Sequence, residues 1–233
     1  AIDAQGSKIF DQVDYSNYLD YIAEEVRSWS YMKFPFIKSI GPENGWYRVG
    51  PLARLNVAEG ITTPLAAKEF QEFKKLGNGG MVEGSLYFHY ARLIEGLYAT
   101  ERVKELLQKE EICGTELRVS SSKYNEEGVG VLEAPRGTLF HHFWVDSSGA
   151  IKKANIIVAT QNNNLAMNRA VYLVAKDYVK ADKLTEGMLN RVEVAIRCYD
   201  PCLSCATHAI GQMPIAIELV SHTGEMLDEV HTD

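Results

Sequence analysis

The sequence predicts an α+β protein that is dominated by helices and carries a small antiparallel sheet. Apolar residues recur at helical spacing over most of the chain, whereas residues 128–158 and 215–230 show the pattern of strands joined by short turns. The chain has 233 residues, of which 46% are hydrophobic and 24% are charged. This composition is typical of a globular protein, and the length suffices for a sizeable core in one domain or two small ones.

The N-terminal part is predicted to contain one helix followed by an irregular segment. Residues 14–32 have an apolar face at helical spacing. Residues 31–56 are interrupted by prolines and glycines, which break regular structure. We therefore expect a helix from Asp14 to Met32, and we expect its buried face to carry Tyr18, Ile22, Val26 and Trp29.

Two further helices are predicted before the first strand. Thr63-Pro64 combines an N-cap residue with a proline at the first helical position, and Gly77 is a suitable helix end. A long helix is expected from about Glu83 to Lys109 because its apolar residues fall on one side. We expect this helix to pack against another helix through Leu86, Tyr90, Leu93, Leu97 and Leu106.

Three strands are predicted in the middle of the chain. They run from Gly128 to Leu132, from Thr138 to Val145 and from Ile151 to Val158, and each is rich in β-branched and aromatic residues. The segment Asp146-Ser147-Ser148-Gly149 has the composition of a hairpin turn between the second and third strands. An antiparallel sheet is the expected result.

The remaining elements are two helices and a second strand pair. Helices are predicted from Asn164 to Val179 and from Thr185 to Arg197, and Asn162-Asn163-Asn164 is expected to form the turn and cap before the first of them. Residues 215–220 and 226–230 are expected to pair as strands around the turn at residues 222–225.

The charge distribution argues against some classes of function. The net charge is -7, so nothing in the composition indicates nucleic-acid binding. Residues 209–233 contain five acidic residues and no lysine or arginine, and they carry most of this charge. No apolar run is long enough for a membrane span, and the N-terminal residues do not resemble a signal peptide. We expect a reducing, cytoplasmic setting.

A short run near the end of the chain combines side chains that commonly bind metals. Cys202 and Cys205 are separated by two residues, so both sulfurs can face one metal ion, and His208 follows as a third ligand or a neighbour of the site. Three of the four cysteines lie within eight residues, which is not the pattern of a disulfide framework. A metal site and a redox dithiol both remain open from spacing alone. A zinc site would need a fourth ligand, for which the spacing indicates no candidate.

The other cysteines and histidines have ordinary structural explanations. Cys113 and Cys198 are expected to be small buried packing residues. His141 and His142 are adjacent in a predicted strand, so their side chains point to opposite faces, and we expect one in the core and one in solvent. His89 lies in an apolar helix, where packing is the expected role.

The run from Asp200 to His208, Asp-Pro-Cys-Leu-Ser-Cys-Ala-Thr-His, resembles the C-terminal metal signature of the large subunit of nickel–iron hydrogenases. Four other segments also resemble that family and occur in its order along the chain. The run after Cys205, to Pro214, is most similar to the NAD-reducing, bidirectional type. The four segments are Val49–Asn56, Ala91–Glu95, Glu133–His141 and Ala159–Asn163.

The resemblance implies a helix-dominated hydrogenase large-subunit-like fold and a role for each matching residue. Cys202 would be a terminal nickel ligand, and Cys205 would bridge nickel and iron. Arg136 would place its guanidinium over the open coordination position, and Asp200 would hold Arg136 in place.

Three more residues would complete the surroundings of the metals. Pro135 and Thr160 would line the pocket around the cyanide and carbon monoxide ligands of the iron, and His208 would lie beside a magnesium ion. The implied reaction is reversible heterolytic cleavage of dihydrogen. The implied partners are an iron–sulfur small subunit, diaphorase subunits that connect it to NAD, a nickel-insertion chaperone and a maturation endopeptidase.

The chain departs from the family pattern at two places. The family uses two Cys-x-x-Cys motifs, but only Cys202 and Cys205 are present here, so we expect the chain to be the C-terminal part of a large subunit whose N-terminal half is missing. No cofactor would then be complete in this chain alone. In the family an endopeptidase cuts after the histidine of the motif, so residues 1–208 would be the subunit part and 209–233 an extension removed between His208 and Ala209.

Two hypotheses other than a catalytic hydrogenase subunit remain open. One is a non-catalytic hydrogenase-like subunit that retains the fold but not the cluster, and the intact Cys202 and Cys205 argue against it. The other is a structural zinc protein. Metal analysis of the chain expressed with the missing half separates these hypotheses.

Overall fold

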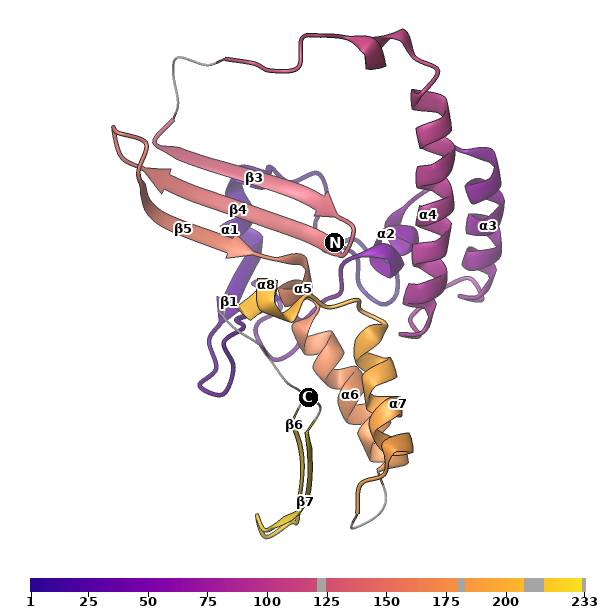
Figure 1. Cartoon of the computed structure of the whole chain (residues 1–233), viewed down its shortest axis with the longest axis vertical. Helices are drawn as coiled ribbons and strands as arrows, with labels where there is room; N and C mark the ends of the chain where they lie inside the picture. The colour runs from indigo at the N-terminus through magenta and orange to yellow at the C-terminus, as the bar shows by residue number, and fades with distance from the viewer. Residues whose placement is uncertain (121–124, 180–182, 208–215, 232–233) are drawn as a thin grey trace. The chain divides into compact units, whose positions relative to one another are not determined.

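The computed structural model describes residues 1–120, 125–179, 183–207 and 216–231 (Figure 1). The chain folds into two compact units, each made of segments that are distant in the sequence. The first unit contains Ala1–Tyr18 and Val49–Ile157, and the second contains Leu19–Arg48 and Val158–Asp233.

The first unit combines a three-stranded sheet with three helices. The sheet is antiparallel with the strand order β3-β4-β5, and the predicted strands are confirmed with longer bounds for the first two. Ala134 pairs with Gly137, so only two residues connect β3 to β4. The elements are η1 (Tyr15–Asn17), α2 (Pro51–Val57), α3 (Pro64–Lys75), α4 (Tyr87–Leu106), η2 (Glu110–Cys113), β3 (Glu127–Ala134), β4 (Gly137–Val145) and β5 (Ile151–Ile157), and α1 (Tyr18–Tyr21) begins at the end of this unit.

The helices α3 and α4 pack together, and a side chain of α4 caps α3. The carboxylate of Glu101 on α4 accepts hydrogen bonds from the backbone N–H groups of Leu65 (3.1 Å) and Ala66 (2.9 Å). These N–H groups belong to the first turn of α3 and have no partner within the helix. The predicted start at Thr63-Pro64 is confirmed, with Pro64 as the first helical residue.

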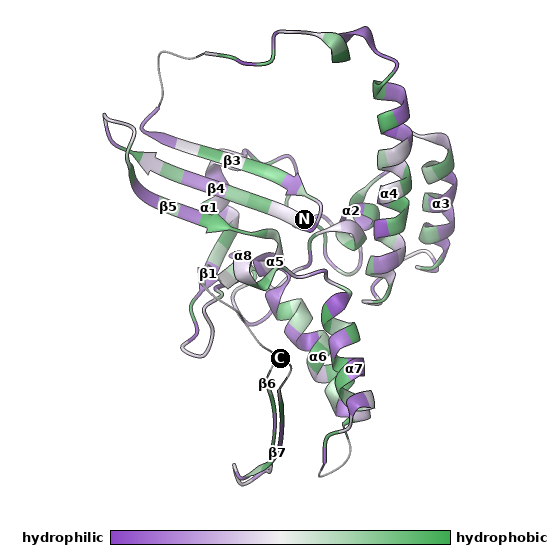
Figure 2. Cartoon of the chain, viewed as in Figure 1, coloured by the Kyte–Doolittle hydropathy of each residue, from purple (hydrophilic) through white to green (hydrophobic). Residues whose placement is uncertain are grey.

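The face of α4 that is buried differs from the expected one. Phe88, Ala91 and Ile94 are buried, whereas Leu86 is 64% and Leu93 is 73% exposed. Hydrophobic and hydrophilic bands alternate along this helix (Figure 2). Because apolar residues lie all around α4, periodicity did not identify the side on which α2 and α3 pack.

The second unit contains two strand pairs and four helices. Its elements are β1 (Ile22–Glu25), β2 (Phe34–Ile37), α5 (Ala159–Asn162), α6 (Asn164–Tyr178), α7 (Glu186–Arg197), α8 (Leu203–Thr207), β6 (Ala216–Val220) and β7 (Met226–His231). Strands β6 and β7 form the predicted antiparallel pair, and the predicted helices α6 and α7 pack on each other.

The expected helix from Asp14 to Met32 is wrong. The chain has only the short turns η1 and α1 there, and β1 then pairs with β2 in an antiparallel hairpin. This pairing buries Phe34 and Ile37, and β2 also contacts α5 and α6, whereas Val26 and Trp29 are exposed. Contacts with residues more than 100 positions later therefore override the local helical pattern.

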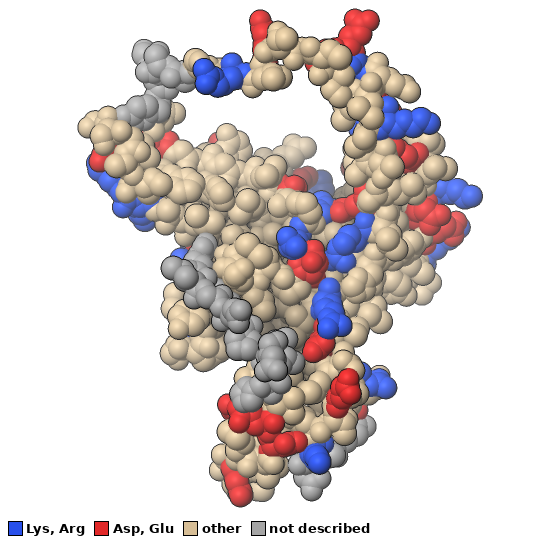
Figure 3. All heavy atoms as spheres, in the orientation of Figure 1, with Lys and Arg blue, Asp and Glu red and all other residues tan. Residues whose placement is uncertain are grey.

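The segment at residues 31–56, expected to be irregular, contains regular structure at both ends. Strand β2 occupies its first part, and α2 begins at Pro51. Pro51 at the first helical position is a start signal that the prediction passed over. In the part of the chain that the structure describes, no helix is long and apolar enough to cross a bilayer. On the face drawn in Figure 3, acidic and basic side chains are interspersed.

Candidate metal centre

The cysteine turn, residues 200–205, begins where α7 ends. Asp200 has a positive φ of 49°, a left-handed conformation that aspartate tolerates better than most residues. Pro201 follows and cannot continue a helix. The chain therefore turns sharply after Arg197 and starts a new short helix, α8, at Leu203.

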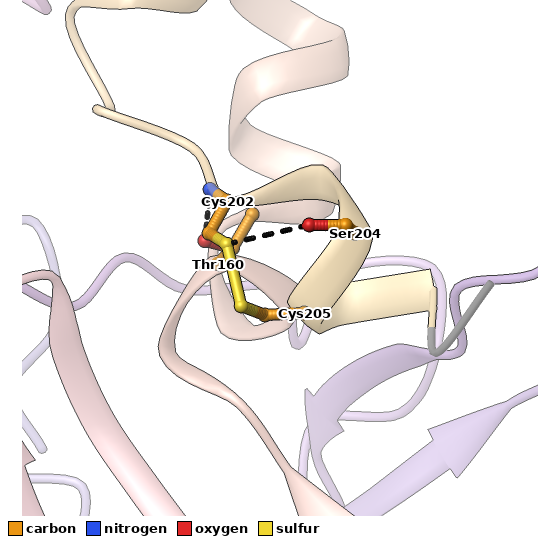
Figure 4. Close-up of a disulfide and its surroundings, with 4 residues drawn as sticks. All are labelled: Thr160, Cys202, Ser204 and Cys205. Atoms are coloured by element: carbon orange, nitrogen blue, oxygen red, sulfur yellow. Dashed lines mark hydrogen bonds between the residues drawn. A yellow bond between two sulfur atoms is a disulfide. The ribbon is translucent and has the colours of Figure 1, made fainter. Parts of the chain in front are cut away.

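The sulfur atoms of Cys202 and Cys205 lie next to each other in this turn. The structure joins them as a disulfide, with Cα atoms 5.4 Å apart (Figure 4). Ser204 lies between them in sequence, and its hydroxyl oxygen is 3.8 Å from the Cys202 sulfur. Two-electron reduction would release two neighbouring thiolates, which is the donor pair that a soft or borderline metal ion binds.

Thr160 connects the cysteine turn to α5. The backbone N–H of Cys202 donates a hydrogen bond of 3.0 Å to the Thr160 hydroxyl oxygen, and α5 contacts α8. Thr160 is only 5% exposed, so this contact is shielded from water. A side chain that is 42 positions earlier in the sequence thus fixes the first cysteine of the pair.

Four buried residues with amide side chains, 161–164, follow Thr160 in the second unit. Asn162 accepts a hydrogen bond of 2.5 Å from the Tyr47 hydroxyl, and Gln161 donates one of 2.6 Å to the carboxylate of Glu24. Burial, and secondarily the charge of Glu24, raises the pKa of Tyr47, which keeps its hydroxyl protonated as a donor. The prediction of a turn and cap at residues 162–164 missed this burial, because the sequence showed no apolar signal there.

Arg136 lies in the arginine turn, the two-residue connection Pro135-Arg136 between β3 and β4. The segment Val49-Gly50 lies directly against this turn. A Cβ atom on Gly50, where φ is 92°, would be 2.7 Å from the carbonyl oxygen of Arg136. A Cβ atom on Gly137, where φ is 136°, would be 2.9 Å from the nitrogen of Gly50. Only glycine at both positions permits so close an approach.

Arg54 on α2 makes several hydrogen bonds at the arginine turn. Its guanidinium donates to the carbonyl oxygens of Ala134 (2.9 Å) and Pro135 (2.8 Å). It also donates to both carboxylate oxygens of Glu95 (2.7 Å each) and to Glu133 (3.0 Å). Partial burial alone would lower the pKa of Arg54, but hydrogen bonds and charges of Glu95 and Glu133 outweigh it and raise that pKa.

The structure brings some of the predicted site residues together within each unit. Thr160 contacts Cys202, and Asp200, Cys202 and Cys205 share one turn in the second unit. Pro135 and Arg136 share the arginine turn in the first unit. The predicted pairing of Arg136 with Asp200 stays a prediction.

His208 and Ala209 lie outside the described residues. Among the residues that the structure describes, no group of three or more His, Cys, Asp and Glu side chains is arranged to hold a metal ion. The described donor set is therefore the two sulfurs of the cysteine turn.

Sequence reasoning missed Arg54 and Glu95 as members of the site's support. Both belong to segments that resembled the hydrogenase family, Val49–Asn56 and Ala91–Glu95. The resemblance therefore marked these segments, but it assigned no role to either residue. Their sequence separation of 41 residues hides the ion pair, whose shortest distance is 2.7 Å.

Some of the predictions for the burial of the remaining cysteines and histidines are confirmed, and others are wrong. Cys198 is buried, and His142 is buried while His141 is exposed, as expected. Cys113 is exposed in η2, and His89 is exposed on α4 because the opposite side of that helix packs, so both packing predictions are wrong.

Comparison with known proteins assigns the family. The profile of the family described as nickel-dependent hydrogenase matches residues 3–208. The chain belongs to this family. The hydrogenase chain is 47% identical to the NAD-reducing hydrogenase HoxS subunit beta of Cupriavidus necator, over 95% of its own length and 46% of that protein. It is 42% identical to an F420-non-reducing hydrogenase protein of Methanothermobacter thermautotrophicus, over 98% of its length and 48% of that protein.

The fold comparison agrees with the sequence comparison. The hydrogenase chain superposes on an NAD+-reducing nickel–iron hydrogenase in the H2-reduced state with a TM-score of 0.84 at 44% identity. This match covers 89% of the chain and 46% of the solved one. The expected α+β, helix-dominated hydrogenase fold is thereby confirmed. The chain spans about half the length of the curated relatives it matches.

The residues of the cysteine turn fit a nickel–iron centre as part of its ligand set. Two neighbouring sulfurs provide soft donors, and Thr160 fixes the backbone of the first. The cysteine turn provides two such sulfurs.

Proposed function

We propose that this chain forms the C-terminal part of a hydrogenase large subunit that splits and forms dihydrogen reversibly. The observation that carries this proposal is the cysteine turn, which places the sulfurs of Cys202 and Cys205 together beside Thr160 in a member of the nickel-dependent hydrogenase family. The similarity to an NAD-reducing hydrogenase supports electron transfer to NAD through partner subunits.

The nickel–iron centre, with cyanide and carbon monoxide on its iron, supplies the site at which dihydrogen is cleaved. Cys202 and Cys205 bind the metals as thiolates, and a thiolate sulfur can also hold the released proton. In the role that the resemblance implies, Arg136 would contribute a permanent positive charge with rigid donors to the reaction, and Asp200 would orient it. The resemblance likewise assigns Pro135 and Thr160 to the surroundings of the iron ligands.

The assembly that this function requires is larger than the chain. The two remaining cysteine ligands come from the N-terminal half of the large subunit, an iron–sulfur small subunit takes the electrons, and diaphorase subunits pass them to NAD. In the same proposal, a nickel-insertion chaperone would load the site, His208 would serve beside a magnesium ion, and an endopeptidase would cut between His208 and Ala209. The family match ends at residue 208, which supports the division into residues 1–208 and an extension of residues 209–233.

Co-expression with the remainder of the large subunit tests the proposal. The chain purified alone should show no hydrogen-dependent dye reduction, because two thiolates do not complete the centre. The chain assembled with the remaining part and the small subunit should contain nickel and iron, show infrared bands of cyanide and carbon monoxide, and reduce dye with dihydrogen. Zinc alone, no metal, or full activity of the isolated chain would contradict the proposal.

The role of Arg136 has its own test in the assembled enzyme. Arg136→Gln should lower the hydrogen-dependent rate by about 100- to 1000-fold, which is the usual effect of removing one preorganised charged or hydrogen-bonding group from a reacting centre. Nickel content and the infrared bands should persist, because Arg136 is not a proposed metal ligand. Arg102→Gln, which removes a partly exposed arginine of the first unit, is the control and should retain activity. An Arg136→Gln enzyme with undiminished rate per nickel would refute this role.

A further inference from the structure

Arg54 uses every hydrogen-bond donor that an arginine has. A guanidinium carries five N–H groups in a fixed planar arrangement. The Nε donates to Glu95, one terminal nitrogen donates to Glu133 and the Ala134 carbonyl, and the other donates to Glu95 and the Pro135 carbonyl. The guanidinium is thus fully engaged by a helix, a strand and the arginine turn.

The two carbonyl groups bound by Arg54 belong to the two peptide units that precede the Cα atom of Arg136. Holding the oxygens of Ala134 and Pro135 fixes the orientation of the two peptide planes that lead into the turn. On its other side, the carbonyl of Arg136 lies against Gly50, which has no room for a Cβ atom. The backbone of Arg136 is therefore held on both sides by residues of the segment Val49–Val57.

Glu95 determines how the guanidinium of Arg54 is oriented. Its two carboxylate oxygens take one N–H from Nε and one from a terminal nitrogen, each at 2.7 Å, which is the bidentate geometry of strong arginine–carboxylate pairs. The side chains of Arg54 and Glu95 are 24% and 25% exposed, so water screens this pair less than a surface pair. Such a pair leaves the guanidinium a single orientation.

We propose that Arg54, oriented by Glu95, is a positioning residue that holds the arginine turn where Arg136 serves the hydrogenase reaction. This inference rests on the proposed function of Arg136. Arg54 itself does not touch dihydrogen or the metals, and it acts through the backbone of residues 134–136. A displacement of the turn by about 1 Å would be enough to reduce the rate by up to about 100-fold.

Lysine cannot replace Arg54 in this role. An ammonium group keeps the positive charge, but it has three donors that diverge from one atom and cannot bind a carboxylate and two carbonyls in one plane. Arg54→Lys should therefore recover only a small part of the activity that Arg54→Gln loses. Glu95→Gln keeps the shape of the carboxylate but replaces one acceptor by a donor, so the bidentate pair is lost.

The test is a double-mutant cycle in the assembled hydrogenase that contains this chain. The rate of hydrogen-dependent dye reduction per nickel is measured for Arg54→Gln, Arg136→Gln, the double variant and the Arg102→Gln control. Arg54→Gln should lower kcat by about 10- to 100-fold with little change in the KM for dihydrogen. In the Arg136→Gln background, the same substitution should cause no further loss, because the residue through which it acts is already absent.

Each outcome decides the inference. An Arg54→Gln enzyme with the control's rate, or a loss of equal size in both backgrounds, would overturn the positioning role. If Arg136→Gln itself retains the rate, the proposed role of Arg136 is refuted. This outcome can be distinguished from a failure of the positioning role of Arg54, because it is read from the Arg136→Gln enzyme alone. Should Arg54→Gln prevent assembly, Glu95→Gln enters the same cycle with the same expected result.

Discussion

The arginine turn and the cysteine turn are held in place by opposite kinds of interaction. Around Arg136, the guanidinium of Arg54 and the carboxylates of Glu95 and Glu133 form charge-assisted hydrogen bonds that connect three elements. Around Cys202, Thr160 on α5 supplies a neutral hydrogen bond through its hydroxyl, and burial shields this bond from water.

This difference fits the proposed role of each turn. If Arg136 serves the reaction, a rigid frame of charged residues suits it, because a small displacement of such a group is costly. If Cys202 and Cys205 bind metal ions, their sulfurs have to separate from the closed pair and act as ligands. The Thr160 contact holds the backbone at the start of this turn and does not involve the sulfur atoms.

The largest effect is expected from the sulfurs of the cysteine turn. Cys202→Ser and Cys205→Ser should each abolish nickel incorporation and hydrogen-dependent activity of the assembled enzyme, because a hydroxyl is a poor ligand for this centre. Nickel and iron are measured by elemental analysis of the purified complex.

The matched control for these variants is Cys113→Ser. Cys113 is exposed in η2, so its substitution should leave the metal content unchanged. Full nickel content in either the Cys202 or the Cys205 variant would show that this turn is not the metal centre, and the comparison of the two turns would lose its functional meaning.

The next effect concerns the hydrogen bond that anchors Cys202 of the cysteine turn to Thr160. Thr160→Val keeps the size of the side chain but removes the oxygen that accepts the Cys202 N–H, so a shielded donor loses its partner. This change should cost about 1–3 kcal/mol of stability, seen as a lower Tm of the assembled subunit. Nickel content should also fall.

Ser204→Ala is the control for that anchor, because its exposed hydroxyl has only a long contact to the Cys202 sulfur. It should change the Tm by much less than Thr160→Val does. Equal stability of the Thr160→Val protein and the wild type would mean that other contacts hold the cysteine turn.

The smallest effect should distinguish charged from neutral support by the response to pH, with the Glu101 cap of α3 as the charged case. Desolvation acts to raise the pKa of Glu101, but hydrogen bonds from the start of α3 outweigh it and lower that pKa. The contribution of Glu101 to stability is therefore present above its unfolded pKa of about 4.3 and lost as the pH falls through its lower folded value. Glu101→Gln should thus reduce stability at pH 7, and its effect should fade as the pH is lowered toward about 3.

Thr160→Val provides the contrast in the same pH series, because no charge takes part in its hydrogen bond. Its loss of stability should be the same at both pH values in chemical denaturation. Glu105→Gln, on the same helix as Glu101 and paired with the partly exposed Arg102, should change little at either pH. A Glu101→Gln effect that persists undiminished at the lower pH would remove the distinction between charged and neutral support.

Local signals in the sequence were sufficient for most of the fold. Thr63-Pro64, the strands on both sides of Asp146–Gly149 and the helix α6 each have their start, end or period within a few residues. The hairpin β1–β2 was missed because its stability comes from burial of Phe34 and Ile37, which depends on contacts between β2 and α5 far along the chain.

The same distinction applies to the candidate site. The motif at residues 200–208 and the segment around Arg136 are continuous in sequence, so their resemblance to a family could be recognised. The contacts of Thr160 with Cys202 and of Arg54 with Glu95 join residues more than 40 positions apart, and no spacing rule predicts them.

The close approach of Gly50 and Gly137 also gives a criterion for sorting sequences. A chain with both cysteines intact but with a larger residue at either glycine cannot hold Arg136 against the 49–50 segment in the same way. Such a chain would keep both cysteines and lose this placement of the arginine turn. If Arg136 has the proposed role, inspection of the two glycines separates sequences that can place its charge in this way from sequences that cannot.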